Sequence, residues 1–169
     1  MGTVQPGWEG RYFGDFTVGD IYRCRYGRTV TESDNTTFTL LTNNTNQIHF
    51  NREYARRTEW GRCLVNSALT LSIVAGMSVT DVSENGFALG WEEILLPHPV
   101  FAGDTLYSES EVLDVRPSRS RPSQGIVKVE TRGYNQDGDL VIRYQRSVMV
   151  WKREYAPRME LFPALPSGQ

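Results

Sequence analysis

The longest apolar stretch of the chain covers residues 61–79, which read GRCLVNSALTLSIVAGMSV and carry no charge after Arg62. A helix that is apolar on every side must be buried on every side. At roughly 15 residues, or about 22 Å, the helix would be too short to cross a bilayer, and the stretch is rich in serine. The pattern therefore predicts a central helix that other elements enclose.

The second half of the chain alternates apolar and polar residues with the period of two that is typical of half-buried strands. Strands are expected at residues 87–96, 104–115, 126–135 and 140–151, with an Asp137-Gly138 hairpin turn before the last. Upstream, residues 21–31 read as a strand, residues 32–42 as a helix capped by Thr31 or Ser33, and residues 51–57 as a short helix. The expected fold class is α+β, with one antiparallel sheet wrapped round one long helix.

Length, charge and cysteine content indicate which classes of protein the chain can belong to. The 169 residues fit a single domain, 1–169, that can bury a core without metals or disulfides. A formal net charge of -2 and a pI of about 5.7 argue against a nucleic-acid partner, because phosphate binding needs a basic excess. Cys24 and Cys63 form no CxxC pair, which indicates free thiols in a reducing compartment. Since the N-terminus has no apolar run, we expect a cytoplasmic protein without membrane contact.

A polar run interrupts the first half of the chain, because Thr42 to Asn46 are all polar and His49 follows three residues later. Residues 44–49 (NTNQIH), PVFAGDTL at residues 99–106 and the order of elements resemble the MaoC-like hotdog hydratases, the family of the (R)-specific enoyl-CoA hydratases. The segments TESDNTTFTLLTNNTNQIHF, GRCLVNSALTL and SRP are similar to the group that hydrates mesaconyl-CoA and itaconyl-CoA. The resemblance covers about 14–153, the expected core of one hotdog domain, and leaves 154–169 as a C-terminal tail.

The chain departs from the family motif, which is Asp, any residue, Asn, Pro, any residue, His. Asn44 stands for the Asp, Gln47 for the Pro, and Asn66-Ser67 for the usual His-Gly pair that opens the central helix. An amide cannot take a proton from water, so His49 is left as the general acid and base near neutral pH. The resemblance implies that Asn44 and His49 hold the same water. Alternatively, Asn44 caps a turn and His49 is a buried histidine with satisfied hydrogen bonds.

The resemblance also suggests which residues contact the thioester. The N–H of Ser67, at the positive end of the helix dipole, is expected to stabilise the enolate oxygen, with Asn46 and Asn66 as further substrate contacts. Asn66 and Ser67 are equally suited to plain helix capping. Arg119 and Arg121, in the loop RPSRSRPSQG, can pair with coenzyme A phosphates or a second substrate carboxylate, although loop arginines are usually only solvated.

We therefore expect a hydro-lyase that adds water reversibly to a 2-enoyl-CoA thioester with a short branched or dicarboxylic acyl group, such as mesaconyl-CoA. A carrier-protein thioester is left open. No cofactor is expected, because coenzyme A enters only as part of the substrate. Proteins of this fold commonly pair their sheets edge to edge, which implies a homodimer or a higher oligomer. Two alternatives use the same fold: an acyl-CoA thioesterase, which would want a carboxylate where Asn44 stands, and a non-catalytic subunit that binds acyl thioesters.

Overall fold

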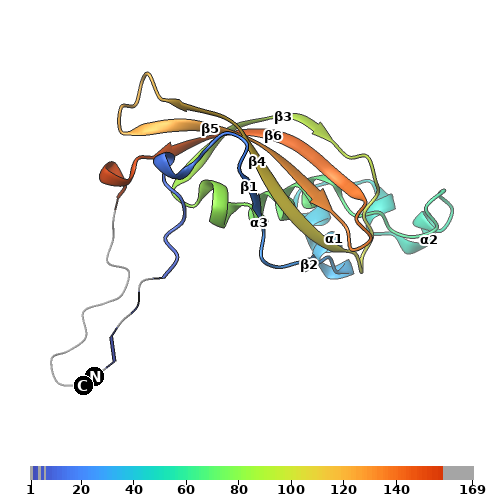
Figure 1. Cartoon of the computed structure of the whole chain (residues 1–169). Helices are drawn as coiled ribbons and strands as arrows, with labels where there is room; N and C mark the ends of the chain where they lie inside the picture. The colour runs from blue at the N-terminus through green and yellow to red at the C-terminus, as the bar shows by residue number, and fades with distance from the viewer. Residues whose placement is uncertain (1, 4, 6, 158–169) are drawn as a thin grey trace.

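One antiparallel sheet forms the body of the molecule (Figure 1). The computed structural model describes residues 2, 3, 5 and 7–157, so residues 158–169 of the expected tail lie outside the described residues. The strands follow the spatial order β1-β4-β5-β6-β3, and β2 also pairs with β4. Their bounds are β1 (Ile21–Arg23), β2 (Arg28–Thr29), β3 (Gly86–Leu95), β4 (Thr105–Pro117), β5 (Gln124–Tyr134) and β6 (Leu140–Trp151).

The α-helices gather on one side of the sheet, and the sheet arches over α3 (Figure 1). The α+β fold class and the four strands expected in the second half are confirmed. The helical elements are α1 (Glu32–Leu41), α2 (Arg52–Ala55), α3 (Ser67–Met77), and the short turns η1 (Phe13–Asp15), η2 (Gln47–His49), η3 (Val79–Ser83) and η4 (Arg153–Tyr155).

The single strand expected at residues 21–31 is wrong, because two short strands take its place. Arg23 lies opposite Glu109 and Arg28 opposite Leu106, so the chain uses five residues to pass three partner positions on β4. The surplus residues form a bend between β1 and β2. The Asp-Gly turn is confirmed, since Gly138 adopts a φ of 84° between β5 and β6, a backbone conformation that suits glycine.

Helix α3 buries one face against the sheet and leaves the other open. The buried side of α3 and residues of the sheet form one hydrophobic core. This core includes Leu69, Val74 and Met77 of α3 and Leu106, Ile142 and Tyr144 of the strands.

The outer face of α3 carries exposed small residues, Ser67, Ala68, Ser72 and Gly76. The expectation of a helix enclosed on every side is therefore wrong for a single chain. One sheet can cover only one side of a helix, so complete burial would need a second layer. The small side chains of this face would let such a layer approach closely.

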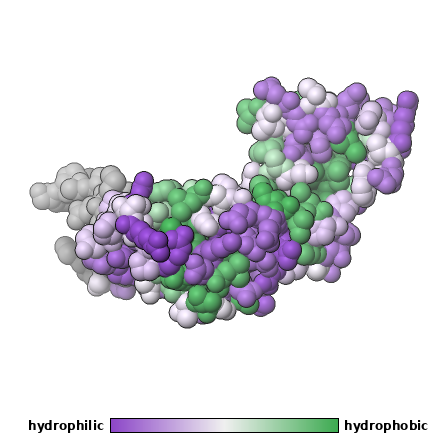
Figure 2. Space-filling view, turned by 90° about the horizontal axis from the view of Figure 1, so that it is seen from above, coloured by the Kyte–Doolittle hydropathy of each residue, from purple (hydrophilic) through white to green (hydrophobic). Residues whose placement is uncertain are grey.

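The edge strand β3 exposes a row of large apolar side chains. Phe87, Leu89 and Trp91 alternate along the strand and are 43%, 48% and 44% exposed. Beyond them, Ile94 and Leu95 are also exposed. An edge strand has unpaired backbone groups on one side, and a contiguous apolar surface commonly marks an interface. Seen from above in Figure 2, the end that carries α1 and α2 projects from the sheet as a lobe, and apolar side chains gather where the two meet.

The start of α1 is fixed by a reciprocal cap. The Thr31 hydroxyl accepts the N–H of Asp34 at 3.1 Å, and the Asp34 carboxylate accepts the N–H of Thr31 at 2.8 Å. Arg28 pairs with the same carboxylate at 2.9 Å. The Arg28 hydrogen bond, followed by the bonds from Thr31, lowers the pKa of Asp34 to about 2. The prediction of Thr31 as the cap is confirmed.

We predict that Asp34→Ala lowers stability at neutral pH by about 1 kcal/mol, the usual contribution of a helix cap, and Tm by roughly 2–4 °C. Because the folded-state pKa lies below the ordinary value, the contribution of Asp34 is present above about pH 4 and is lost as the pH falls toward 2. In thermal unfolding measured from pH 7 down to pH 2, the difference in Tm between the wild type and Asp34→Ala should therefore shrink. As a control, Asp114→Ala alters an exposed pair with Arg116 and should leave Tm unchanged. A difference that stays constant with pH would contradict this account.

Candidate active site

The polar run at residues 42–46 folds into two successive side-chain turns. The Asn44 Oδ1 accepts the N–H of Asn46 at 3.0 Å, and the Asn46 Oδ1 accepts the N–H of Ile48 at 3.2 Å. Asparagine favours such turns because its short side chain reaches the backbone two residues on. The two turns lead the chain from α1 into η2 and place His49 inside the protein, where it is 8% exposed. Asn44 and Asn46 therefore act in the structure as turn formers.

The ring of His49 is held in one orientation by the backbone. Its Nδ1 lies 2.8 Å from the carbonyl oxygen of Leu64. A carbonyl can only accept, so the neutral ring must carry its proton on Nδ1, and the lone pair is on Nε2. No partner for Nε2 is found within the described residues, and His49 lines a cavity. The arrangement is that of a base whose free nitrogen is Nε2.

A single buried amide ties the His49 segment to the start of α3. Asn35, 2% exposed, donates from Nδ2 to the carbonyls of His49 at 2.8 Å and Leu64 at 3.1 Å. Its Oδ1 accepts the N–H of Asn66 at 2.8 Å. All three bonds need this orientation of the amide, because a flipped amide would set oxygen against two carbonyls. Asn35 is a positioning residue that sequence reasoning missed, although buried polar residues four apart on α1, Asn35 and Thr39, were a signal.

Two residues at the start of α3 have different roles: Asn66 is the N-cap, and Ser67 is the first residue of the helix. The Asn66 Oδ1 accepts the N–H of Ala68 at 2.9 Å, and its Nδ2 donates to the Thr39 hydroxyl at 3.2 Å. Both ends of this side chain are engaged, so the capping alternative holds for Asn66, and its side chain is not free for substrate. Ser67 is exposed, and its N–H has no acceptor among the described residues. Unpaired N–H groups of a first helical turn attract negative charge.

Two cavities lie next to the segment that precedes α3. The smaller, about 220 Å³, is lined by Ser67, Leu64 and His98 among others. The larger, about 630 Å³, lies within the usual range for small-molecule sites. It is lined by His49 and by residues of α1, of the start of α2, of the segment before α3 and of the loop before β4, namely Glu32, Asn35, Thr36, Phe50, Asn51, Arg52, Glu53, Arg62, Cys63 and Ala102.

The acidic and thiol groups of the larger cavity are unsuited to nucleophilic attack. Glu32 forms an ion pair with Arg52, and Glu53 pairs with Arg56 at 2.8 Å. Burial raises the pKa of the Cys63 thiol, and the Glu32 carboxylate adds to the effect, so the thiol stays protonated at neutral pH. Glu32 lies outside the family motif, but the structure brings it into the cavity with His49.

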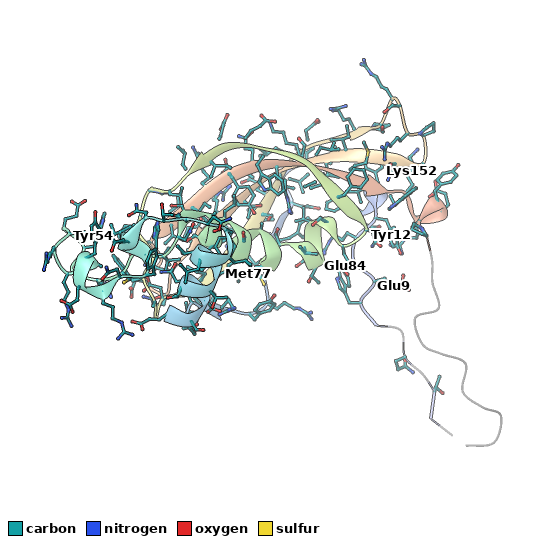
Figure 3. The ribbon with its side chains drawn as sticks, turned by 180° about the vertical axis from the view of Figure 1, so that it is seen from behind. Glu9, Tyr12, Tyr54, Met77, Glu84 and Lys152 are labelled. Carbon is teal, nitrogen blue, oxygen red and sulfur yellow. The ribbon has the colours of Figure 1, made fainter. Side chains whose placement is uncertain are left out.

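The structure places the arginine loop, residues 116–125, at the end of the sheet that lies opposite His49 and α2. The Lys152 Nζ donates to the Pro122 carbonyl at 2.7 Å, and Figure 3 shows Lys152 and Tyr54 of α2 at opposite ends of the molecule. Strand β4, 13 residues or about 40 Å long, separates the two ends. Arg119 and Arg121 therefore do not line the cavity of His49 in the same chain. Their predicted substrate contact would require the loop of a partner copy.

Across residues 7–157, no helix is long and apolar enough to cross a membrane. The same part of the chain contains no cluster of three or more His, Cys, Asp or Glu residues that could hold a metal ion.

Comparison with known sequences identifies close relatives of the chain. The family model described as mesaconyl-CoA hydratase matches residues 4–158. A mesaconyl-CoA hydratase from Cereibacter sphaeroides is 35% identical over 148 residues, which cover 87% of this chain and 43% of that protein. A β-methylmalyl-CoA dehydratase from Chloroflexus aurantiacus is 34% identical over 162 residues, covering 94% of this chain and 46% of that protein. The chain thus spans less than half the length of these relatives.

Solved structures agree with this relationship. A MaoC-domain dehydratase from Chloroflexus aurantiacus is 32% identical, with a TM-score of 0.84 over 96% of this chain and 47% of the other. A Mycobacterium tuberculosis protein with a double hotdog fold shows the shared fold alone, at 19% identity and a TM-score of 0.78 over 89% of this chain and 47% of the other. The chain has the MaoC-like hotdog fold and belongs to the mesaconyl-CoA hydratase family.

Proposed function

We propose that this chain adds water reversibly to a 2-enoyl-CoA thioester with a short branched or dicarboxylic acyl group, such as mesaconyl-CoA. The observation that carries the proposal is the hydrogen bond between His49 Nδ1 and the Leu64 carbonyl, which leaves Nε2 as a base beside a cavity of about 630 Å³. Relatives named as a mesaconyl-CoA hydratase and a β-methylmalyl-CoA dehydratase support the same reaction in its two directions.

The proposed mechanism uses one side-chain base. His49 Nε2 takes a proton from water as the water oxygen bonds to the β-carbon, and the protonated ring then returns this proton to the α-carbon. In this proposal the thioester reaches from the cavity of His49 to the smaller cavity, which Ser67 lines, and the N–H of Ser67 meets the negative charge on the thioester oxygen. A donor of this type is typically worth about 3 kcal/mol. Asn44 does not line the larger cavity, although its Nδ2 has no acceptor among the described residues, so the proposal gives Asn44 no step of its own. Addition of water changes no oxidation state overall, so the proposal needs no redox cofactor.

We also propose that the working form is a homodimer in the cytoplasm. The apolar row on β3 and the open face of α3 would be covered by a partner copy. A partner would also be the source of arginine-loop contacts that one chain cannot make with its own His49. Cys24 and Cys63 are free thiols, which suits a reducing compartment.

The reaction is tested with purified protein and mesaconyl-CoA or crotonyl-CoA, following loss of the enoyl absorbance and release of free thiol. The expected result is loss of absorbance without thiol. Thiol release would instead indicate a thioesterase, and binding without either change a non-catalytic subunit.

We predict that His49→Ala and His49→Gln lower kcat by at least about a hundredfold, because each removes the proposed acid–base group. Glu32→Gln is the matched cavity variant. It removes a carboxylate that pairs with Arg52 and should lower kcat far less than His49→Ala does. If Glu32→Gln costs as much as His49→Ala, the single-base mechanism is wrong. Near-full activity of His49→Ala would remove His49 from the mechanism.

For the homodimer, we predict a mass in solution of about 38 kDa, twice the chain mass of 19.2 kDa. Leu89→Asp and Trp91→Asp place charges on the apolar row of β3 and should shift the protein toward 19 kDa in light scattering after size exclusion. Tyr155→Asp, at an exposed aromatic residue of η4, is the control and should leave the mass unchanged. A wild-type monomer, or β3 variants that remain dimeric, would refute the interface.

A further inference from the structure

Arg62 lies beside the proposed base. It precedes Leu64 by two residues, and the Leu64 N–H donates to the Ile48 carbonyl at 3.1 Å while the Leu64 carbonyl accepts from His49 Nδ1 at 2.8 Å. The segment that carries Arg62 therefore runs alongside the segment that carries His49. Both residues line the larger cavity.

Among the described residues, no carboxylate neutralises the charge of Arg62. Within residues 7–157, no acidic side chain lies within ion-pair distance of Arg62, whereas Arg52 at the same cavity is paired with Glu32. The Arg62 guanidinium instead lies over the ring of Phe101, 3.7 Å from its centroid. A ring covers only the face of a guanidinium and leaves the N–H groups at its edge free to bind a carboxylate as a fork.

These contacts suit one class of substrate. In a fumaryl-type thioester such as mesaconyl-CoA, the second carboxylate is attached to the β-carbon, the atom that water attacks. A base that delivers oxygen to this carbon must have the carboxylate close to it. The cation that binds the carboxylate must then lie on the same cavity as the base, as Arg62 does.

We propose that Arg62 binds the second carboxylate of a dicarboxylic enoyl thioester and so determines substrate specificity. The inference rests on the proposed function, since it assumes that His49 acts on an enoyl thioester in this cavity. Arg52 is less suited because Glu32 already occupies it, and Arg119 and Arg121 lie at the other end of the sheet. Arg62 takes no proton in the reaction: the water proton goes to His49 Nε2.

The test compares mesaconyl-CoA with crotonyl-CoA, which has a methyl group where mesaconyl-CoA has its carboxylate. For Arg62→Met, the ratio of kcat/KM for mesaconyl-CoA over crotonyl-CoA should fall by about fiftyfold, the size expected for one charge-assisted pair. Arg62→Lys keeps the charge without the fork and should fall between Arg62→Met and the wild type. The control Arg57→Met removes an exposed arginine that does not line the cavity and should leave the ratio unchanged.

The dissociation constants of both thioesters, measured by calorimetry, separate the two proposals because binding needs no turnover. If the wild type hydrates mesaconyl-CoA and neither the kinetic nor the binding ratio changes in Arg62→Met, the inference about Arg62 is wrong and the proposed function stands. If no protein hydrates either thioester, the proposed function fails, and a binding preference that is lost in Arg62→Met still supports the carboxylate site. An unchanged binding preference would then overturn both. Circular dichroism and Tm verify that each variant is folded.

Discussion

The hydrogen bond between the His49 ring and the Leu64 carbonyl is the constraint on which the proposed site depends. It selects the tautomer, aims Nε2 away from the backbone and fixes the ring beside the segment that leads into α3. Asn35 keeps this bond in place by binding the carbonyls of His49 and Leu64 and the N–H of Asn66. A buried polar network of this kind is stable only when each member is satisfied, so loss of one amide would loosen three segments at once.

A site with a single base and a guanidinium that pairs with no carboxylate of residues 7–157 differs in charge from one with an Asp–His pair. A carboxylate at position 44 would add negative charge to the turn that leads to His49, and like charges repel across the short distances of a cavity. The neutral Asn44 and the positive Arg62 both favour an anionic acyl group. The proposed chemistry and the proposed specificity therefore have a common electrostatic origin.

The sequence predicted those features that depend on local rules. The alternation of apolar and polar residues predicted β3 to β6, Thr31 was one of two predicted caps of α1, and the Asp-Gly pair at Gly138 predicted the hairpin turn. The motif pointed to His49, but the role of Asn35 depends on contacts across 14 and 31 residues, which no local pattern encodes.

Other site features had to be seen in three dimensions. Within the described part of the chain, Arg62 has no carboxylate partner because the nearby carboxylate of Glu32 pairs with Arg52. The separation between the arginine loop and His49 could have been estimated from the sequence, because the loop comes after the full length of the strand β4. The open face of α3 went unrecognised because an apolar helix has the same composition whether its own chain or a partner covers it.

The tautomer of His49 is the most direct test of the central claim. The chain has two histidines, so a His98→Asn variant leaves a single imidazole whose nitrogen-15 signals need no assignment. At a pH where the ring is neutral, the account predicts a protonated Nδ1 and an unprotonated Nε2. A ring that carries its proton on Nε2 would contradict the account, because the nitrogen that must accept the proton of water would already be occupied.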